Sequence, residues 1–407
     1  MDYIRRARGT ETWWSPELRH VFYGLDADLI MLALVTHEKN FMLLREKMSV
    51  RHGATTKDPI QYGREDFELL EISLLRKLLN LQFVSLEDPK KFPFALKLER
   101  VIDDFVFLCF LIGNDFLPHV AHLNIADGSL TMMMNSYKKM LPTIGGYLTN
   151  KTHIYLARVE LFCRELSKHE ANYFERRGAE EHDDLFADPQ RYREHYYRSK
   201  FGWEVGTQEG GALVRKLVHD FVTGLHWCLE YYHNGVGSWD WYFPHLYAPL
   251  ASDLLNLTAI EFSFARGRPF TPLMQLLAVL PATSGRLLPP PYRDLMTKRY
   301  SPLAEFYPAD FQIDQNGKSH AWEAVVKIPF LDEACMLDVL KSIDHKRDLS
   351  PEERLRNAKG EERRFDPSRV AAAPGAAATF KQRRPRAVQK GRDANEEALT
   401  TFGRTMK

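Results

Sequence analysis

The first part of the chain alternates between short apolar runs and segments in which apolar residues recur at helical spacing. Residues 19–23 form an apolar run that Gly24 ends, and residues 28–36 continue with the spacing of a helix. Residues 41–45 (FMLLR) form a second short apolar run. This pattern predicts a strand, a turn and a helix over residues 19–36, followed by another short buried strand.

Two long helices are predicted next. Apolar residues between positions 64 and 83 gather on one broad face of a helix, and residues 95–112 form a second helical pattern. Gly113 is suited to end that second helix. Strand-like and helical segments that alternate in this way favour an α/β fold, with a parallel sheet flanked by helices.

The character of the chain changes after residue 175. Residues 176–189 are charged and poor in apolar side chains, which predicts an exposed loop. Aromatic-rich helices are expected over residues 192–254, and we expect the last ordered element to end near Leu340. Few large apolar residues remain beyond about residue 356, so the tail is predicted to be disordered. Its segment 381–392 (KQRRPRAVQKGR) carries six positive charges and no acid.

Composition narrows the class of protein. The 55 Lys and Arg residues balance 54 Asp and Glu, a net charge of +1, so a nucleic-acid site would have to be a local patch. No apolar run approaches the roughly 18 residues of a membrane helix, and the N-terminus lacks the apolar segment of a secretory signal. The widely spaced Cys109, Cys163, Cys228 and Cys335 have no zinc-ligand spacing, which favours buried thiols in a reducing compartment.

Two carboxylates follow the first predicted strand. Asp26 and Asp28 stand two residues apart, where the strand ends and the helix begins. Ligands of α/β sheets bind at the carboxyl ends of strands, and carboxylates there supply the oxygen ligands that Mg²⁺ prefers. The alternative is structural, because either side chain could cap free N–H groups of the next helix.

A third carboxylate, Asp115, follows the apolar segment FVFLCFLI in the sequence Gly113-Asn114-Asp115. An acid in so apolar a neighbourhood needs a partner such as a cation, an arginine or backbone N–H groups. An ordinary turn aspartate is the alternative. Asp103 and Asp104 are weaker candidates, because the middle of the same predicted helix lies too far from Asp115 to share its site.

Aromatic residues concentrate in the segment SWDWYF. It contains Trp239 and Trp241, with Tyr231, Tyr232 and Tyr247 nearby. Exposed rings could stack on nucleobases, a contact worth about 1–3 kcal/mol per base. Buried rings would only pack in the core, and the sequence leaves both interpretations open.

Several long motifs, in order along residues 1–357, resemble the Xrn-type 5′→3′ exoribonucleases. They include HVFYGLDADLIMLAL, RVIDDFVFLCFLIGNDFLPH, GLHWCLEYYHNGVGSWDWYFPHLYAP and FYPADFQIDQNGKSHAWEAVVKIPFLDE. Gly24-Leu25 before the aspartates and the motif LPTIGGYL are more similar to the cytoplasmic paralogue than to the nuclear one.

The resemblance implies a flap-endonuclease-like (PIN-like) α/β nuclease core, and hydrolysis of single-stranded RNA with a 5′-monophosphate to mononucleotides in mRNA decay. By motif match, Asp26, Asp28 and Asp115 would be catalytic and would bind Mg²⁺ or Mn²⁺. The family's ions act as a two-metal clamp on the attacking and leaving oxygens. Trp239 or Trp241 would support stacking on the 5′ nucleotide, and the motif does not distinguish the two rings.

The resemblance also predicts four regions. Residues 1–175 would be the C-terminal part of the nuclease core, 176–190 an exposed charged loop, 191–345 a mostly helical, aromatic-rich wrapping domain, and 346–407 a low-complexity basic tail. We expect a cytoplasmic protein without a membrane contact. A nuclear location is the alternative, because the basic run of the tail resembles a nuclear signal as readily as an RNA contact.

Family members begin with a long segment that carries further metal-binding acids and a lysine that grips the 5′ phosphate. Met1 matches an internal position of the family, so we expect this chain to be inactive by itself and to need a companion chain or segment. An unpaired sheet edge with exposed apolar surface is a further expectation. The alternative hypothesis is a catalytically inactive RNA-binding or scaffold protein of the same family.

Overall fold

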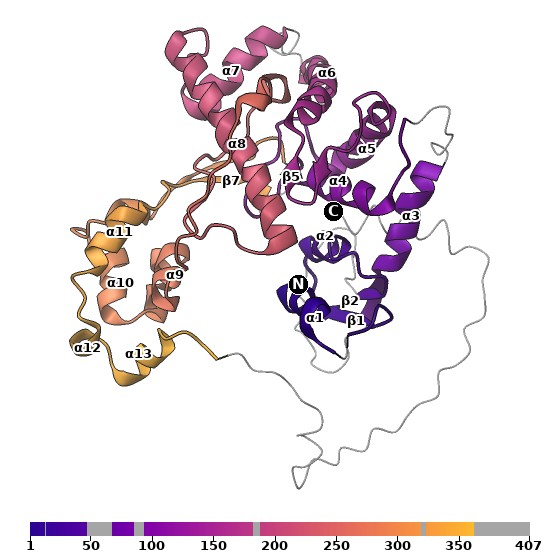
Figure 1. The fold of residues 1–407 in the computed structure, drawn as a ribbon. Helices are drawn as coiled ribbons and strands as arrows, with labels where there is room; N and C mark the ends of the chain where they lie inside the picture. The colour runs from indigo at the N-terminus through magenta and orange to yellow at the C-terminus, as the bar shows by residue number, and fades with distance from the viewer. Residues whose placement is uncertain (13, 47–66, 85–92, 182–187, 319–322, 362–407) are drawn as a thin grey trace. The chain divides into compact units, whose positions relative to one another are not determined.

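The computed structural model describes residues 1–361 except residue 13 and residues 47–66, 85–92, 182–187 and 319–322. The chain forms two compact units that divide between Arg268 and Pro269. The first unit contains the three-stranded sheet and the longest helices, and the second is built from short helices and a two-stranded sheet (Figure 1). The predicted α/β fold class is confirmed, whereas the four predicted regions stay a prediction.

The sheet of the first unit is mixed rather than parallel. Its order is β1 (His20–Tyr23), β2 (Phe41–Glu46), β3 (Phe67–Glu71). β1 pairs parallel with β2, and β3 pairs antiparallel with β2. The strands predicted before Gly24 and over residues 41–45 are therefore confirmed, and the all-parallel sheet is wrong for the described strands.

The helix predicted over residues 64–83 is wrong at its beginning. Residues 64–66 lie outside the described residues, the next five form β3, and helix α3 covers Ile72–Val84. The register of β3 on β2 runs from Glu71 opposite Met42 to Phe67 opposite Glu46. A short apolar segment can form either a helix or a strand. Residues 67–71 form a strand because they pair with the edge of β2 that β1 leaves free.

β1 forms an edge of this sheet, and its side chains remain uncovered. Val21 is 56% exposed and Tyr23 is 58% exposed, while Phe67 and Leu69 of β3 are also exposed. Among the described strands only β2 pairs with β1. The expected unpaired edge with exposed apolar surface is thus present in the described part of the chain.

Helix α4 (Leu98–Phe110) lies at the centre of the first unit. Every residue from Val101 to Phe110 is buried, as expected of a helix that other elements surround. Helices α2 (Asp28–Leu34), α5 (Ser129–Met140) and α8 (Gln208–Asn234) all contact it. The helix predicted over residues 95–112 is confirmed.

Asp104 anchors a distant segment to this central helix. Its carboxylate accepts hydrogen bonds from the Tyr137 hydroxyl (2.6 Å), the Leu148 N–H (2.7 Å), and the N–H (2.8 Å) and hydroxyl (2.7 Å) of Thr149. Thr149 lies in β4 (Thr149–Asn150) of a small hairpin. Asp104 therefore has a structural role, in agreement with its low rank as a site candidate.

The loop predicted over residues 176–189 is wrong at its beginning. Helix α6 (Leu156–Glu181) continues through residues 176–181, and residues 182–187 lie outside the described residues. Asp188 then caps helix α7 (Pro189–Phe201), because its side chain accepts a hydrogen bond from the Gln190 N–H at 2.9 Å. The aromatic-rich helices expected over residues 192–254 are confirmed as far as Asn234, by α7 and α8. The expectation is wrong beyond that point, because residues 235–250 form no helix and only the short 3-10 helix η3 (Ala251–Asp253) follows.

The second unit extends further than predicted. Its longer helices are α9 (Pro272–Val279), α10 (Pro290–Thr297) and α11 (Glu333–Leu340); β6 (Gln312–Asp314) and β7 (Val325–Lys327) form its sheet, and α12 (His345–Asp348) and α13 (Pro351–Arg356) follow. The expectation that order ends near Leu340 is wrong. Ser350 and Glu353 form a reciprocal capping box at the start of α13, a signal that the sequence S-P-E-E contains.

The described helices include none that is long and apolar enough to cross a membrane. Most of the predicted disordered tail falls in residues 362–407, outside the described residues.

Candidate active site

Asp26 and Asp28 lie directly beyond the carboxyl end of β1. The Gly24 N–H still donates to the Leu44 carbonyl at 3.0 Å, so the chain leaves the sheet just before the two aspartates. The Asp26 carboxylate accepts a hydrogen bond from the Asp28 N–H at 3.0 Å, beside the first turn of α2. The capping alternative is therefore realised in part, and this contact orients Asp26 while its side chain stays exposed.

Asp115 lies in a tight loop after α4. Gly113 adopts a φ of 99°, a conformation that favours glycine. The side-chain oxygen of Asn114 accepts hydrogen bonds from the N–H groups of Phe116 (2.9 Å) and Leu117 (2.8 Å). These two contacts fix the loop and leave Asp115 exposed.

The fold brings the three predicted carboxylates together. One carboxylate oxygen from each of Asp26, Asp28 and Asp115 lies within 4.8 Å of the other two. Burial, and then the neighbouring charges of Asp26 and Asp115, raise the pKa of Asp28 to about 6, and a hydrogen bond with Tyr232 opposes this rise. Carboxylates this close repel one another when ionised, and a cation between them would remove that repulsion.

This donor set fits a hard divalent cation. It offers only oxygen atoms, as Mg²⁺ and Mn²⁺ prefer, and two of the three side chains are exposed, which leaves room for water and phosphate ligands. Asp103 is not part of the group, since its carboxylate lies 2.9 Å from Nε2 of His37. Within the part of the chain that the structure describes, the three aspartates are the group of side chains suited to a metal ion.

Sequence reasoning missed two side chains that support this group. Tyr232 of α8 hydrogen-bonds with Asp28. Arg45 of β2 is 7% exposed, donates from Nη2 to the Leu25 carbonyl at 2.7 Å, and has a buried Nη1 without a hydrogen-bond partner. Its position on the buried face of an alternating strand was the available signal, because a buried arginine needs a structural or functional reason.

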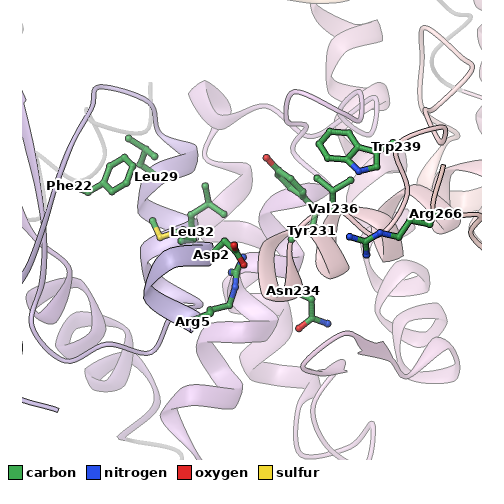
Figure 2. A pocket seen from close by; sticks show the side chains of 12 residues that line it. Asp2, Arg5, Phe22, Leu29, Leu32, Tyr231, Asn234, Val236, Trp239 and Arg266 are labelled. Carbon is green, nitrogen blue, oxygen red and sulfur yellow. The ribbon is translucent and has the colours of Figure 1, made fainter. Parts of the chain in front are cut away.

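The two tryptophans have different environments. Trp241 stacks on Trp227 with ring centroids 5.5 Å apart, and its ring lies so close to Gly224 that a Cβ there would be 2.9 Å away. Trp239 is 48% exposed and lines a cavity of about 480 Å³ in the first unit. Figure 2 shows Trp239 on one side of this cavity and Leu29, which follows Asp28, on the other.

Comparison with protein families shows to which family the chain belongs. Residues 1–47 match the family described as "XRN 5'-3' exonuclease N-terminus", and residues 95–191 and 178–385 match the family described as "Xrn1 helical domain". The chain belongs to the Xrn-type 5′–3′ exoribonuclease family. Within it, Asp26 and Asp28 fall in the N-terminal match, and Asp115 and Trp239 fall in the helical-domain match.

Curated relatives in the Xrn-type family cover nearly all of the chain. The chain is 35% identical to human "5'-3' exoribonuclease 1" over 89% of its own length and 24% of the relative. It is 31% identical to the Schizosaccharomyces pombe protein of the same name, over 88% of its length and 36% of the relative. It is 32% identical to the Drosophila melanogaster "5'-3' exoribonuclease 2 homolog", over 89% of its own length and 50% of the relative. The chain thus spans about a quarter to a half of these relatives.

Proposed function

We propose that this chain takes part in the 5′→3′ hydrolysis of single-stranded RNA that carries a 5′-monophosphate, with release of mononucleotides in RNA turnover and mRNA decay. The observation that carries the proposal is the meeting of Asp26, Asp28 and Asp115, which come from two loops far apart in the sequence. Family membership supports the reaction class. We also propose that the sheet and its helices belong to a flap-endonuclease-like core.

The three carboxylates would hold Mg²⁺ or Mn²⁺ in this reaction. Bound ions would stabilise the charge that develops on the attacking and leaving oxygens of the phosphodiester. Tyr232 orients Asp28, and Arg45 holds the carbonyl of Leu25 that precedes the acidic turn. Trp239, rather than Trp241, would stack on a base, because the Trp239 ring is exposed whereas the Trp241 ring already stacks on Trp227.

We further propose that a companion chain or segment completes this site. Three carboxylates are few for two cations, and the group contains no lysine or arginine to hold a 5′ phosphate. The uncovered β1 edge, with Val21 and Tyr23 exposed, offers a place where another strand could pair. The chain alone would then bind RNA with little hydrolysis, as the alternative of a non-catalytic RNA-binding or scaffold protein also requires.

We place this activity in the cytoplasm, on the likeness of Gly24-Leu25 and LPTIGGYL to the cytoplasmic paralogue. The basic segment 381–392 makes the nucleus the alternative.

Calorimetric titration with Mn²⁺ tests the metal centre. Wild-type chain is expected to bind the ion, and Asp28→Asn should weaken binding at least about tenfold, because it removes a charged ligand. Asp310→Asn, which changes an exposed carboxylate of the second unit, is the matched control and should bind as the wild type does. Equal affinities for wild type and Asp28→Asn would overturn the proposed centre.

An RNA assay separates the catalytic proposals. Chain alone is incubated with Mg²⁺ and RNA that carries either a 5′-monophosphate or a 5′-hydroxyl. Binding without release of mononucleotides is expected of the chain alone. Mg²⁺-dependent release that Asp28→Asn abolishes would overturn the need for a companion while supporting the active site.

A further inference from the structure

Two loops are locked together beside the cavity. The backbone N–H of Trp239 donates to the Arg266 carbonyl at 2.9 Å, and the Asp240 carboxylate accepts a hydrogen bond from the backbone N–H of Arg268 at 3.3 Å. Between these contacts, Gly267 has a φ of 61°, and the Asp240 carboxylate occupies the space that a Cβ at this glycine would need. The backbone therefore holds Trp239 and Arg266 at fixed neighbouring positions.

The side chains of this pair line the same wall of the cavity. Figure 2 shows Trp239 and Arg266 on one side, opposite Asp2, Arg5 and Leu29. The volume of about 480 Å³ is in the range of small-molecule sites, roughly 300–1,000 Å³. A planar ring at the rim and a cation beside it form a surface that suits a base and its phosphate.

Arg266 differs from two other charged residues that line the cavity, Asp2 and Arg5. Arg5 donates to the Tyr232 carbonyl at 3.0 Å, at the end of α8, and Asp2 pairs with Arg6 at 2.9 Å. Arg266 is exposed, and no carboxylate among the described residues forms an ion pair with it. Its guanidinium is thus available to an anion.

We propose that Arg266 pairs with the backbone phosphate that adjoins the base on which Trp239 stacks, so that the two side chains together clamp one nucleotide of a single-stranded RNA. The clamp rests on the proposed function, and it adds a phosphate-binding residue outside the carboxylate group. Such a pair holds RNA without reading its sequence, because every base has a π-face and every unit has a phosphate. Both interactions act in binding and need no metal ion.

Salt-dependent RNA binding tests the clamp. Affinity of the full chain for a labelled 5′-monophosphorylated single-stranded RNA is measured in EDTA at several KCl concentrations. One lost phosphate contact should reduce the slope of log K against log salt by about 0.7. We expect that change for Arg266→Gln, with the slope retained in Arg266→Lys. Arg268→Gln, two residues away and absent from the cavity lining, is the matched control and should keep the wild-type slope.

Base stacking is tested separately. Trp239→Ala should weaken binding about 5- to 140-fold, the range expected for one stacked base. Its slope with salt should stay that of the wild type, and an oligomer of equal length without bases should bind wild type and Trp239→Ala equally. Circular dichroism and thermal unfolding of each variant verify that it is folded.

The outcomes distinguish the two proposals. An Arg266→Gln slope equal to that of the wild type, or an equal change in Arg268→Gln, would overturn the clamp even where the chain binds RNA. A wild-type chain that fails to bind single-stranded RNA would overturn the proposed function and the clamp together. Asp28→Asn could lose Mn²⁺ binding while every arginine variant keeps the wild-type slope of log K against log salt. That result would support the metal centre and overturn only the role of Arg266.

Discussion

The guanidinium of Arg45 donates a 2.7 Å hydrogen bond to the carbonyl of Leu25, the residue that precedes Asp26. This bond links the buried face of β2 to the turn that carries two of the three clustered carboxylates. A charged donor of this kind contributes about 1.5–3 kcal/mol where it is made. The position of the acidic turn therefore depends on a side chain outside the group of three carboxylates.

Arg45→Met is expected to lower Mn²⁺ affinity about tenfold, as loss of an outer-shell contact does in metal sites. The change keeps most of the volume and removes the donor. Arg19→Met, which alters an exposed arginine just before β1, serves as the control and should leave affinity unchanged. An Arg45→Met protein that binds Mn²⁺ as tightly as the wild type would show that the turn holds its shape without this bond.

Cation binding should depend on pH through Asp28. Burial and the neighbouring carboxylates raise the pKa of Asp28 to about 6, so below that pH a proton competes with the ion. Mn²⁺ affinity is expected to fall about tenfold per pH unit below 6 and to level off above it. The same raised pKa means that the ion-free protein loses stability as pH rises from about 4 to about 6, because the buried group must ionise.

Calorimetry between pH 5 and 8 measures this dependence, and Tyr232→Phe provides the comparison. The hydrogen bond of the Tyr232 hydroxyl lowers the pKa of Asp28. Its removal should therefore move the midpoint of the pH dependence of Mn²⁺ affinity to higher pH. A flat profile in the wild type would contradict the assignment of Asp28 as the titrating ligand.

Asp104→Ala should destabilise the first unit by about 3–5 kcal/mol. The substitution leaves the Tyr137 hydroxyl and three donors of Leu148 and Thr149 buried without their acceptor. Asp127→Ala is the control, because that carboxylate is exposed and accepts from the Asn124 side chain at 3.1 Å. Urea unfolding followed by tryptophan fluorescence measures both, and a change below about 1 kcal/mol for Asp104→Ala would refute the anchoring role.

Substitution of Trp241 should mainly reduce the stability of the protein, whereas substitution of Trp239 should mainly reduce RNA binding. Trp241→Ala is expected to cost about 3 kcal/mol of unfolding free energy, since its ring packs on Trp227 and Gly224. Trp239→Ala should change stability by less than about 0.5 kcal/mol, because the ring is half exposed. Thermal unfolding and RNA binding of both variants check the split, and the reverse order of effects would assign stacking to Trp241.

The spacing of apolar residues along the chain was enough to predict several elements of this structure. Apolar spacing and Gly24 predicted β1 and α2, and the unbroken apolar segment before Gly113 predicted α4. Helix α2 is readable because its apolar residues recur at helical spacing, and α4 is readable as a long apolar segment that ends at a glycine. Motif resemblance likewise selected Asp26, Asp28 and Asp115 as a metal-binding set, and the sequence S-P-E-E contains the capping box of α13.

Tertiary structure alone decided which residues meet. The sequence could not show that Asp115 reaches Asp26 and Asp28, that β3 adds to the edge of β2, or that Trp239 is exposed while Trp241 packs. Each of these facts depends on contacts between segments that lie far apart along the chain. Periodicity records only that a side chain is buried, and the packing of the whole unit determines the partner that buries it.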